Sequence, residues 1–472
     1  MLFLPAKVIE GLLVIACSSL YTHIFTKGAA GTFALVNTTV QFCYLVIAGW
    51  LPNAIARYIG EEYQSDKGRK MFSTVSTVYL LICIVVTAAA LIAAAVTRDP
   101  VWLGSAAMFF SYTLFQILNA ALIQLGKMRA SIGLSLLSAS CKLLIAYAIV
   151  HGESGYPSAA PAMIANAVAD GAASIGAVFT LSLPQLARLR YFSGKLLRKF
   201  LKFGVPLMGV SIAVSLLNMI DKYLVTGFFG GDVFAVYNYN NSIASGIFTM
   251  LSVGIMRGVY PAVLRAWREG GLKETQPLLD QGTRLYLLIA APAVAGLSAV
   301  ALPLSRVLFD VSKGYDAGAP VIGLTALAML FMGLTEYANK AYELEQATVH
   351  VLQNSATAAV IKVISSVILL KMFGFMGGAF GSIVAFASYF IITVVRVRKR
   401  FIFHIPAKSL ASILISAFLC GVAAFACTLL PLPNVLRLVC AVPAGAVTYA
   451  VCIVASGEGK AEMQAVLRKL KR

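Results

Sequence analysis

The sequence predicts an all-α membrane protein that crosses the bilayer about fourteen times. Of its 472 residues, 60% are hydrophobic and 12% are charged, and the mean hydropathy is +0.85. Long apolar runs alternate with short basic connectors along the whole chain. A hydrocarbon core of about 30 Å needs about 20 apolar helical residues for each crossing, and run after run reaches that length. Little room is left for a water-soluble domain.

Glycine, proline and charged residues divide the apolar runs into predicted helical spans. In chain order these are 6–26, 32–56, 72–97, 101–125, 130–150, 159–183, 204–229, 233–256, 284–309, 317–341, 350–371, 374–395, 408–430 and 434–455. The first span contains a short match to a lipoprotein cleavage box at Cys17, but Glu10 interrupts its apolar stretch. We therefore interpret this span as an ordinary first transmembrane helix.

Lysine and arginine concentrate in every second connector. The basic clusters are 57–70, 127–129, 188–202, 265–284, 396–408 and 460–472. Because cytoplasmic connectors carry an excess of these residues, we expect both termini in the cytoplasm. The net charge of +19 then reflects membrane topology, and no nucleic acid partner is expected, since that would need one clustered basic face.

The cysteines and histidines form no chemical motif. All eight cysteines lie in apolar runs without CxxC spacing, and the four histidines are scattered. This pattern predicts neither a disulfide framework nor a metal site, and no cofactor is expected. A nucleotide-phosphate motif is also lacking in the sequence, so direct use of ATP is not expected.

The second half of the chain repeats features of the first at an offset of about 200 residues, with the same order in both halves. The matches are Gly31–Asn37 with Gly231–Asn238, Ile55–Arg57 with Ile255–Arg257, and Lys142 with Lys362. Six spans per half preserve orientation, so a pseudo-two-fold axis along the membrane normal is expected. The predicted organisation is an N-terminal lobe (1–187), a basic cytoplasmic linker (188–203), a C-terminal lobe (204–400), and two further helices with a basic tail (401–472).

Three segments resemble a known family. They are Lys199–Leu207, Gly227–Tyr237 and Gly374–Ala379. Together they resemble the polysaccharide-transporter family of lipid-linked oligosaccharide flippases (Wzx-type, which includes O-antigen flippases). That family belongs to the MATE-like superfamily, together with multidrug exporters and the lipid II flippase. The resemblance implies a two-lobed MATE-like fold, alternating access and a bacterial inner-membrane location.

Basic residues at membrane depth are the first candidate site residues, because a charge there costs at least about 2.5–3.5 kcal/mol. Lys142, Lys222 and Lys362 predict a cationic cavity between the halves for an anionic headgroup. Arg57 and Arg257, at the inner ends of the second and eighth spans, are candidates for capturing that headgroup. The alternative is that the lysines pair with carboxylates and the arginines extend to the membrane surface.

Acidic residues in the spans are candidates for ion coupling or charge pairing: Asp170, Asp221 and Glu336. Asp170 is a candidate partner of Lys142. Glu336, Lys340 and Glu343 form one stripe, in which Glu336 and Lys340 have the i,i+4 spacing of a local ion pair. Adjacent helical residues point about 100° apart, so Asp221 is not expected to neutralise Lys222 directly.

These observations predict a flippase that moves a polyprenyl-diphosphate-linked oligosaccharide outward for cell-surface polysaccharide synthesis. Its partners are then that glycan, membrane lipids and other polysaccharide-assembly proteins. One alternative is a cation-coupled multidrug exporter, whose cavity should favour acidic and aromatic residues. Another is a membrane glycosyltransferase or polymerase, but the outer connectors are too short to carry its acid–base or metal-binding residues. A transporter is therefore expected rather than an enzyme.

Overall fold

The computed structural model describes residues 3–66, 68–150, 154–183, 188–398 and 406–458. Its described secondary structure is α-helical, with short 3-10 turns and an isolated bridge between Phe25 and Tyr156. The chain divides into two compact units, and the boundary falls between Met219 and Ile220. This boundary lies inside the predicted seventh span rather than in the predicted linker.

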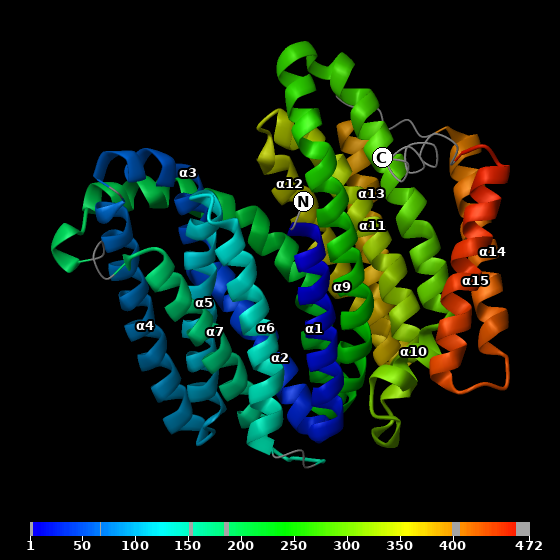
Figure 1. The fold of residues 1–472 in the computed structure, drawn as a ribbon, viewed down its shortest axis with the longest axis horizontal. Coiled ribbons are helices and arrows are strands. Elements are labelled where there is room, and N and C mark those ends of the chain that lie inside the picture. Colours follow the sequence, from blue (N-terminus) through cyan, green and yellow to red (C-terminus); the bar gives the residue numbers. More distant parts are fainter. Residues whose placement is uncertain (1–2, 67, 151–153, 184–187, 399–405, 459–472) are drawn as a thin grey trace. The chain divides into compact units, whose positions relative to one another are not determined.

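The first unit is a bundle with one helix across its ends. Its elements are α1 (Phe3–Ile24), α2 (Lys27–Ile47), α3 (Trp50–Asp66), α4 (Arg69–Thr97), α5 (Val101–Gln124), α6 (Met128–Val150), α7 (Ala160–Thr180), η1 (Leu189–Tyr191) and the beginning of α9 (Gly194–Ala299). In Figure 1, α4 to α7 run side by side, and α3 lies across their ends.

The predicted second span, 32–56, is wrong in its second half, because the chain turns after α2 and begins α3. A side chain at Gly49 would clash with the last turn of α2, and the Trp50 indole nitrogen donates to the Ile47 carbonyl over 3.0 Å. Helix α3 is amphipathic, with apolar side chains buried along one face. Arg57 therefore lies exposed in the middle of α3, not at the end of a membrane span.

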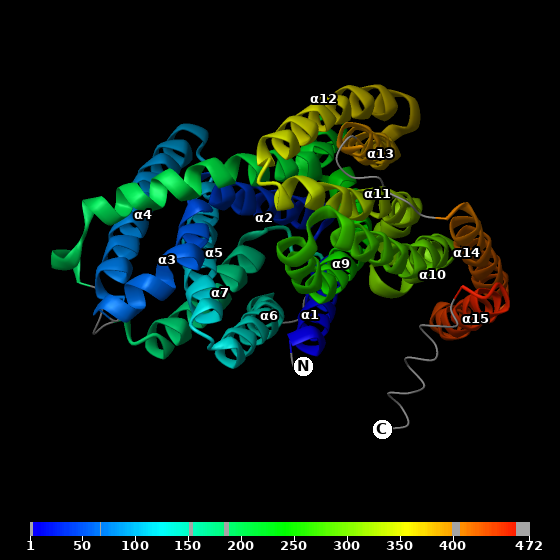
Figure 2. The same ribbon diagram turned by 90° about the horizontal axis from the view of Figure 1, so that it is seen from above.

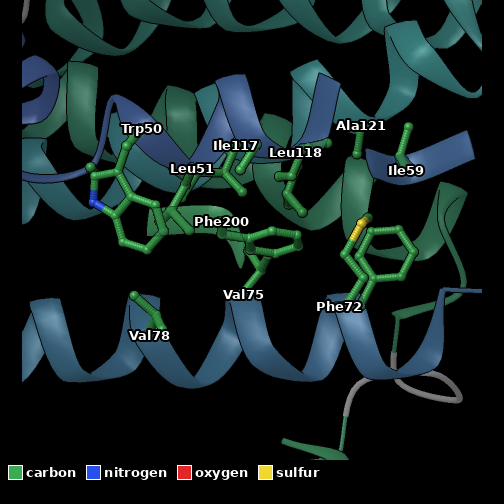
Figure 3. Close-up of a cluster of buried hydrophobic side chains, with 14 of the residues drawn as sticks. Trp50, Leu51, Ile59, Phe72, Val75, Val78, Ile117, Leu118, Ala121 and Phe200 are labelled. Carbon is green, nitrogen blue, oxygen red and sulfur yellow. The ribbon is translucent and has the colours of Figure 1, made fainter. Parts of the chain in front are cut away.

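A hydrophobic core joins α3, α4, α5 and the beginning of α9 (Figure 3). The rings of Tyr58 and Phe200 are stacked with centroids 5.8 Å apart. The Lys199 ammonium lies 4.3 Å from the centroid of the same tyrosine ring. These contacts fasten the beginning of α9 to the first unit, which explains why the boundary between units lies beyond the predicted linker.

Replacing Phe200 by alanine should lower the free energy of unfolding by about 3–5 kcal/mol, the usual cost of a large core cavity. Its ring is 0% exposed. Thermal melting of the purified protein in detergent would measure the effect, with Leu201→Ala as the control, since that neighbouring side chain is 39% exposed. Equal melting temperatures for the two variants would contradict the role given to this core.

The second unit continues α9 through two sharp breaks. Gly230 (φ 80°, ψ 177°) and Gly271 (φ 61°, ψ −144°) have backbone angles that favour glycine. The remaining elements are α10 (Ala301–Leu308), η2 (Val311–Lys313), η3 (Tyr315–Gly318), α11 (Ala319–Leu344), α12 (Thr348–Phe373), η4 (Gly374–Met376), α13 (Gly377–Val397), α14 (Ala407–Thr428) and α15 (Asn434–Ala455). Helix α13 packs against both α11 and α12 (Figure 2). Residues 257–284, predicted as part of a connector, are helical on both sides of Gly271.

Within the second unit, the last two helices are tied to α9. The guanidinium of Arg284 forms an ion pair of 3.1 Å with Glu458, whose carboxylate also accepts from Ser409 over 2.8 Å. The Tyr449 hydroxyl donates to the Leu288 carbonyl over 2.7 Å. The pair α14 and α15 is therefore an addition packed on this unit.

Ten helical stretches of the described chain are long and apolar enough to cross a membrane. Two of them, Met208–Ala299 with 92 residues and Thr348–Val397 with 50, are longer than one crossing requires. Breaks at Gly230, Gly271 and the turn η4 divide these two stretches. When the parts between these breaks are counted separately and the shorter apolar helix Ile9–Ile24 is included, the number of stretches agrees with the predicted number of crossings. The prediction of an all-α multi-pass membrane protein is confirmed.

Candidate functional site

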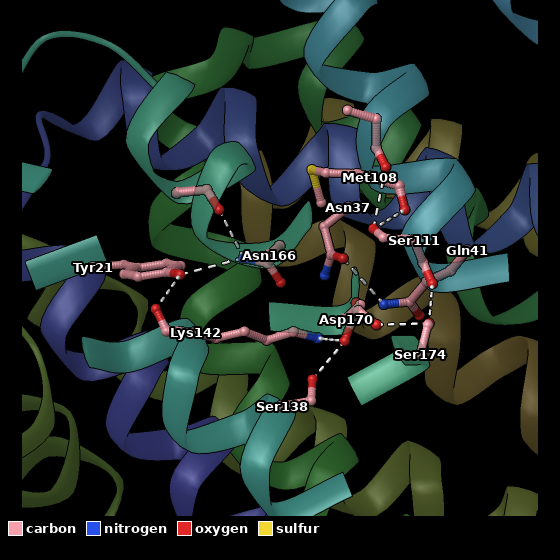
Figure 4. A network of polar contacts seen from close by, with 12 residues as sticks. Tyr21, Asn37, Gln41, Met108, Ser111, Ser138, Lys142, Asn166, Asp170 and Ser174 are labelled. Atoms are coloured by element: carbon pink, nitrogen blue, oxygen red, sulfur yellow. Dashed lines mark hydrogen bonds and ion pairs between the residues drawn. The ribbon is translucent and has the colours of Figure 1, made fainter. Parts of the chain in front are cut away.

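A buried ion pair joins α6 and α7 in the first unit (Figure 4). The Lys142 ammonium lies 2.9 Å from a carboxylate oxygen of Asp170, and the Ser138 hydroxyl donates to that oxygen over 2.5 Å. The Asp170 side chain is 6% exposed, whereas that of Lys142 is 25% exposed. The alternative in which Lys142 pairs with Asp170 is therefore confirmed.

The same polar network reaches α1. The Tyr21 hydroxyl donates to the Lys142 carbonyl over 3.5 Å and accepts from the Asn166 amide over 3.3 Å. On the neighbouring α2, the Gln41 amide donates to Asn37 over 3.4 Å, within the group shown in Figure 4. Hydrogen bonds thus connect α1, α6 and α7 in one polar network, with the polar pair of α2 beside it.

A second buried ion pair lies in the second unit and joins α9 to α12. The Lys362 ammonium lies 2.6 Å from Oδ1 of Asp221, and the two side chains are 1% and 4% exposed. The Tyr237 hydroxyl donates to Oδ2 of Asp221 over 2.5 Å. The ammonium also lies 5.1 Å from the centroid of the Phe386 ring on α13. Every charged atom of this pair has a partner inside the protein.

Lys222 differs from the other two membrane lysines. It follows Asp221 in α9, and its side chain is half-buried. The buried face of this helix carries Asp221 and Val225, while Lys222 and Thr226 lie at its margin. Within the described residues, the Lys222 ammonium has no hydrogen-bonded or ion-paired partner. An ammonium in this state can donate to oxygens of an anionic group.

The two ion pairs have different helix partners although their lysines occupy matching places in the sequence repeat. Lys142 pairs with a carboxylate from the helix that follows it, whereas Lys362 pairs with one from α9, far earlier in the chain. Breaking the fully buried Lys362–Asp221 pair by removing one partner costs about 3–5 kcal/mol, because the other charge stays buried. Both pairs therefore constrain which helices stay together.

The remaining predicted charges have different outcomes. Arg57 is exposed on α3, and the side chain of Arg257 lies outside the described residues. Within the stripe of Glu336, Lys340 and Glu343, the ion pair forms between Lys340 and Glu343, both of whose carboxylate oxygens lie 2.7 Å from the Lys340 ammonium. That ammonium also lies 5.2 Å from the centroid of the Tyr260 ring. Glu336 is half-buried on α11.

Sequence reasoning missed the hydroxyl groups that complete the ion pairs. Tyr237 is fully buried, and its hydroxyl donates to Asp221. The sequence does contain a signal for this contact. Asp221 lies nine positions before Gly230 and Tyr237 seven positions after it, and α9 folds back at that glycine. Positions nearly equidistant from a helical hairpin turn face each other.

No group of three or more His, Cys, Asp or Glu side chains in the described chain is placed to hold a metal ion.

Comparison with known families gives a match over most of the chain. The family model described as lipid II flippase MurJ matches residues 22–437. A curated relative, the probable multidrug resistance protein NorM of Synechocystis sp. (strain ATCC 27184 / PCC 6803 / Kazusa), is 33% identical over 97 residues. That match covers 21% of each protein, so the chain spans about a fifth of the relative's length.

Solved structures of the same fold cover most of the chain at low sequence identity. A lipid II flippase MurJ in an inward closed conformation has a TM-score of 0.77 at 14% identity and covers 99% of both chains. An inward-facing multidrug resistance MATE transporter of the MOP superfamily has a TM-score of 0.66 at 14% identity, covering 83% of this chain and 94% of the other. A MOP superfamily transporter from Pyrococcus furiosus has a TM-score of 0.58 at 14% identity, covering 84% and 93%. These likenesses confirm the MATE-like fold.

Proposed function

The chain belongs to the lipid II flippase MurJ family, and we propose that it moves a polyprenyl-diphosphate-linked saccharide from the inner to the outer leaflet of a bacterial cytoplasmic membrane. The family is one of transporters rather than enzymes. The family match favours lipid II as cargo, while the loose resemblance of the sequence to polysaccharide transporters favours the lipid-linked oligosaccharide of a surface polysaccharide. Both cargoes carry the same anionic diphosphate.

The observation that carries the proposal is the Lys222 ammonium, for which the described residues provide no hydrogen bond or ion pair. Two of the three membrane lysines are neutralised by carboxylates, so Lys222 is the membrane-depth lysine that supports binding of the diphosphate. Arg57, exposed on α3, and Arg257 are proposed to capture the same group at the cytoplasmic side. We propose that both termini lie in the cytoplasm. A negative cell interior favours outward movement of the anionic cargo: two charges crossing 100 mV correspond to about 4.6 kcal/mol.

A flipping assay tests the proposal and separates the cargoes. The full chain is reconstituted in liposomes with either lipid II or an undecaprenyl-diphosphate-linked oligosaccharide, and access of the headgroup to an external reagent is followed over time. We expect flipping of at least one cargo to be faster than in empty liposomes and to increase when the departure side is made negative.

The MATE-like fold also keeps the drug exporter as a second candidate, since the NorM relative is named as a multidrug resistance protein. In the same liposomes, export of a cationic dye without flipping of either lipid would reject the flippase proposal. Lys222 argues against that result, because an ammonium without an ion-paired partner repels a cationic drug.

A further inference from the structure

Both oxygens of the Asp221 carboxylate are occupied by groups other than its neighbour Lys222. Oδ1 contacts the Lys362 ammonium at 2.6 Å, and Oδ2 accepts from the Tyr237 hydroxyl at 2.5 Å. These partners come from α12 and from the stretch of α9 beyond Gly230. Each oxygen of the carboxylate nearest to Lys222 in the sequence is therefore engaged by another group.

The three charged side chains comprise one carboxylate and two ammonium groups, so one positive charge is left over. Because Lys362 compensates Asp221, that remaining charge belongs to Lys222. Without Lys362, the same carboxylate would face the adjacent ammonium as the nearest cation, and the local net charge would fall to zero. At short range in a poorly screened site, a change of one charge strongly alters the attraction for an anion.

We propose that Lys362 is a positioning residue for cargo binding: it engages Asp221 so that the Lys222 ammonium stays available to an anionic diphosphate. This inference rests on the proposed function and deepens it. Lys362 does not contact the cargo in this arrangement, because its side chain is 1% exposed and lies over the Phe386 ring. Its effect on the cargo is electrostatic and passes through Asp221.

A purely structural ion pair would behave differently. If the pair only holds α9 to α12, then Lys362→Met and Asp221→Asn each break it and should impair the protein alike. If Lys362 frees Lys222, the two variants have opposite charge effects. Lys362→Met removes one positive charge and leaves the Asp221 carboxylate without its bound cation, so the local net charge beside Lys222 falls to zero, whereas Asp221→Asn leaves a second positive charge nearby.

The test measures binding of undecaprenyl diphosphate to the full-length protein in detergent, together with the melting temperature of each variant. We expect Lys362→Met to weaken binding on the order of tenfold, and Asp221→Asn to bind at least as tightly as the unmodified protein. The double variant Asp221→Asn/Lys362→Met should return to within about threefold, because Lys222 is again uncompensated. Lys222→Gln serves as the reference for complete loss.

Equal loss of binding in Lys362→Met and Asp221→Asn would overturn the inference. The Lys362–Asp221 ion pair would then have only the structural role of holding α9 to α12. If Lys362→Met does not fold, Asp221→Asn alone tests the inference. Weaker binding of undecaprenyl diphosphate by Asp221→Asn than by the unmodified protein would also overturn it. Normal binding by Lys222→Gln would instead reject the proposed role of Lys222 in cargo binding. The two failures are therefore distinguishable.

Discussion

Replacing Lys222 by glutamine should abolish transport of the lipid-linked cargo while the protein remains folded in the membrane. Glutamine keeps the length and polarity of the side chain but removes the charge that would meet the diphosphate. Losing a desolvated charge contact costs about 2–5 kcal/mol, which corresponds to a drop of roughly thirtyfold or more in binding. The initial flipping rate in liposomes measures this effect directly.

Folding should not suffer in Lys222→Gln, because no internal partner in the described residues is left unpaired. Lys371→Gln is the matched control, since this lysine is exposed near the end of α12. Both variants should show normal membrane abundance, and only the first should lose transport. Full flipping activity of Lys222→Gln at normal abundance would refute the anionic-cargo proposal.

Most helices could be predicted from the sequence because apolar length alone determines them. The last span was predicted as 434–455, and α15 runs from Asn434 to Ala455. The errors lie where hydropathy is uninformative. Helix α3 continues the apolar run of α2 without a charged break, and the turn is marked in the structure by the close contact at Gly49 and the Trp50–Ile47 hydrogen bond. The second break in α9, at Gly271, lies in a polar stretch of helix. Because this stretch is not apolar, hydropathy predicts a connector there and not a helix.

The candidate charges could be located from sequence, but their partners were only partly predictable. The Lys142–Asp170 pair follows from two consecutive spans, whose helices are usually neighbours. The Lys362–Asp221 pair joins residues 141 positions apart, and helix order along the chain does not show which distant helices touch. Helical spacing was also insufficient for Lys340, because i,i+3 and i,i+4 partners are both within reach.

Replacing Gly377 by alanine should prevent stable folding of the second unit. The glycine-rich segment between α12 and α13 turns the chain sharply, with Gly374 at φ 61° and ψ −150°. A Cβ at Gly377 would overlap the backbone of Leu369 in α12, and helical backbone cannot move aside as a side chain can. We expect a loss of about 3 kcal/mol or more, seen as little monodisperse protein and a lowered melting temperature.

A graded series makes the prediction specific to the turn. At Gly378 an added Cβ would lie 3.0 Å from a Val225 methyl and 3.3 Å from the Tyr237 hydroxyl, so Gly378→Ala should destabilise moderately, because side chains can shift. At Gly246, inside α9, nothing lies within 4 Å, and alanine should be neutral or should stabilise the helix by up to about 1 kcal/mol. Melting temperatures should therefore rise from Gly377→Ala through Gly378→Ala to Gly246→Ala. A Gly377→Ala protein as stable as Gly246→Ala would mean that α12 and α13 are not packed as closely as this turn requires, and the position of Lys362 opposite Asp221 would lose its support.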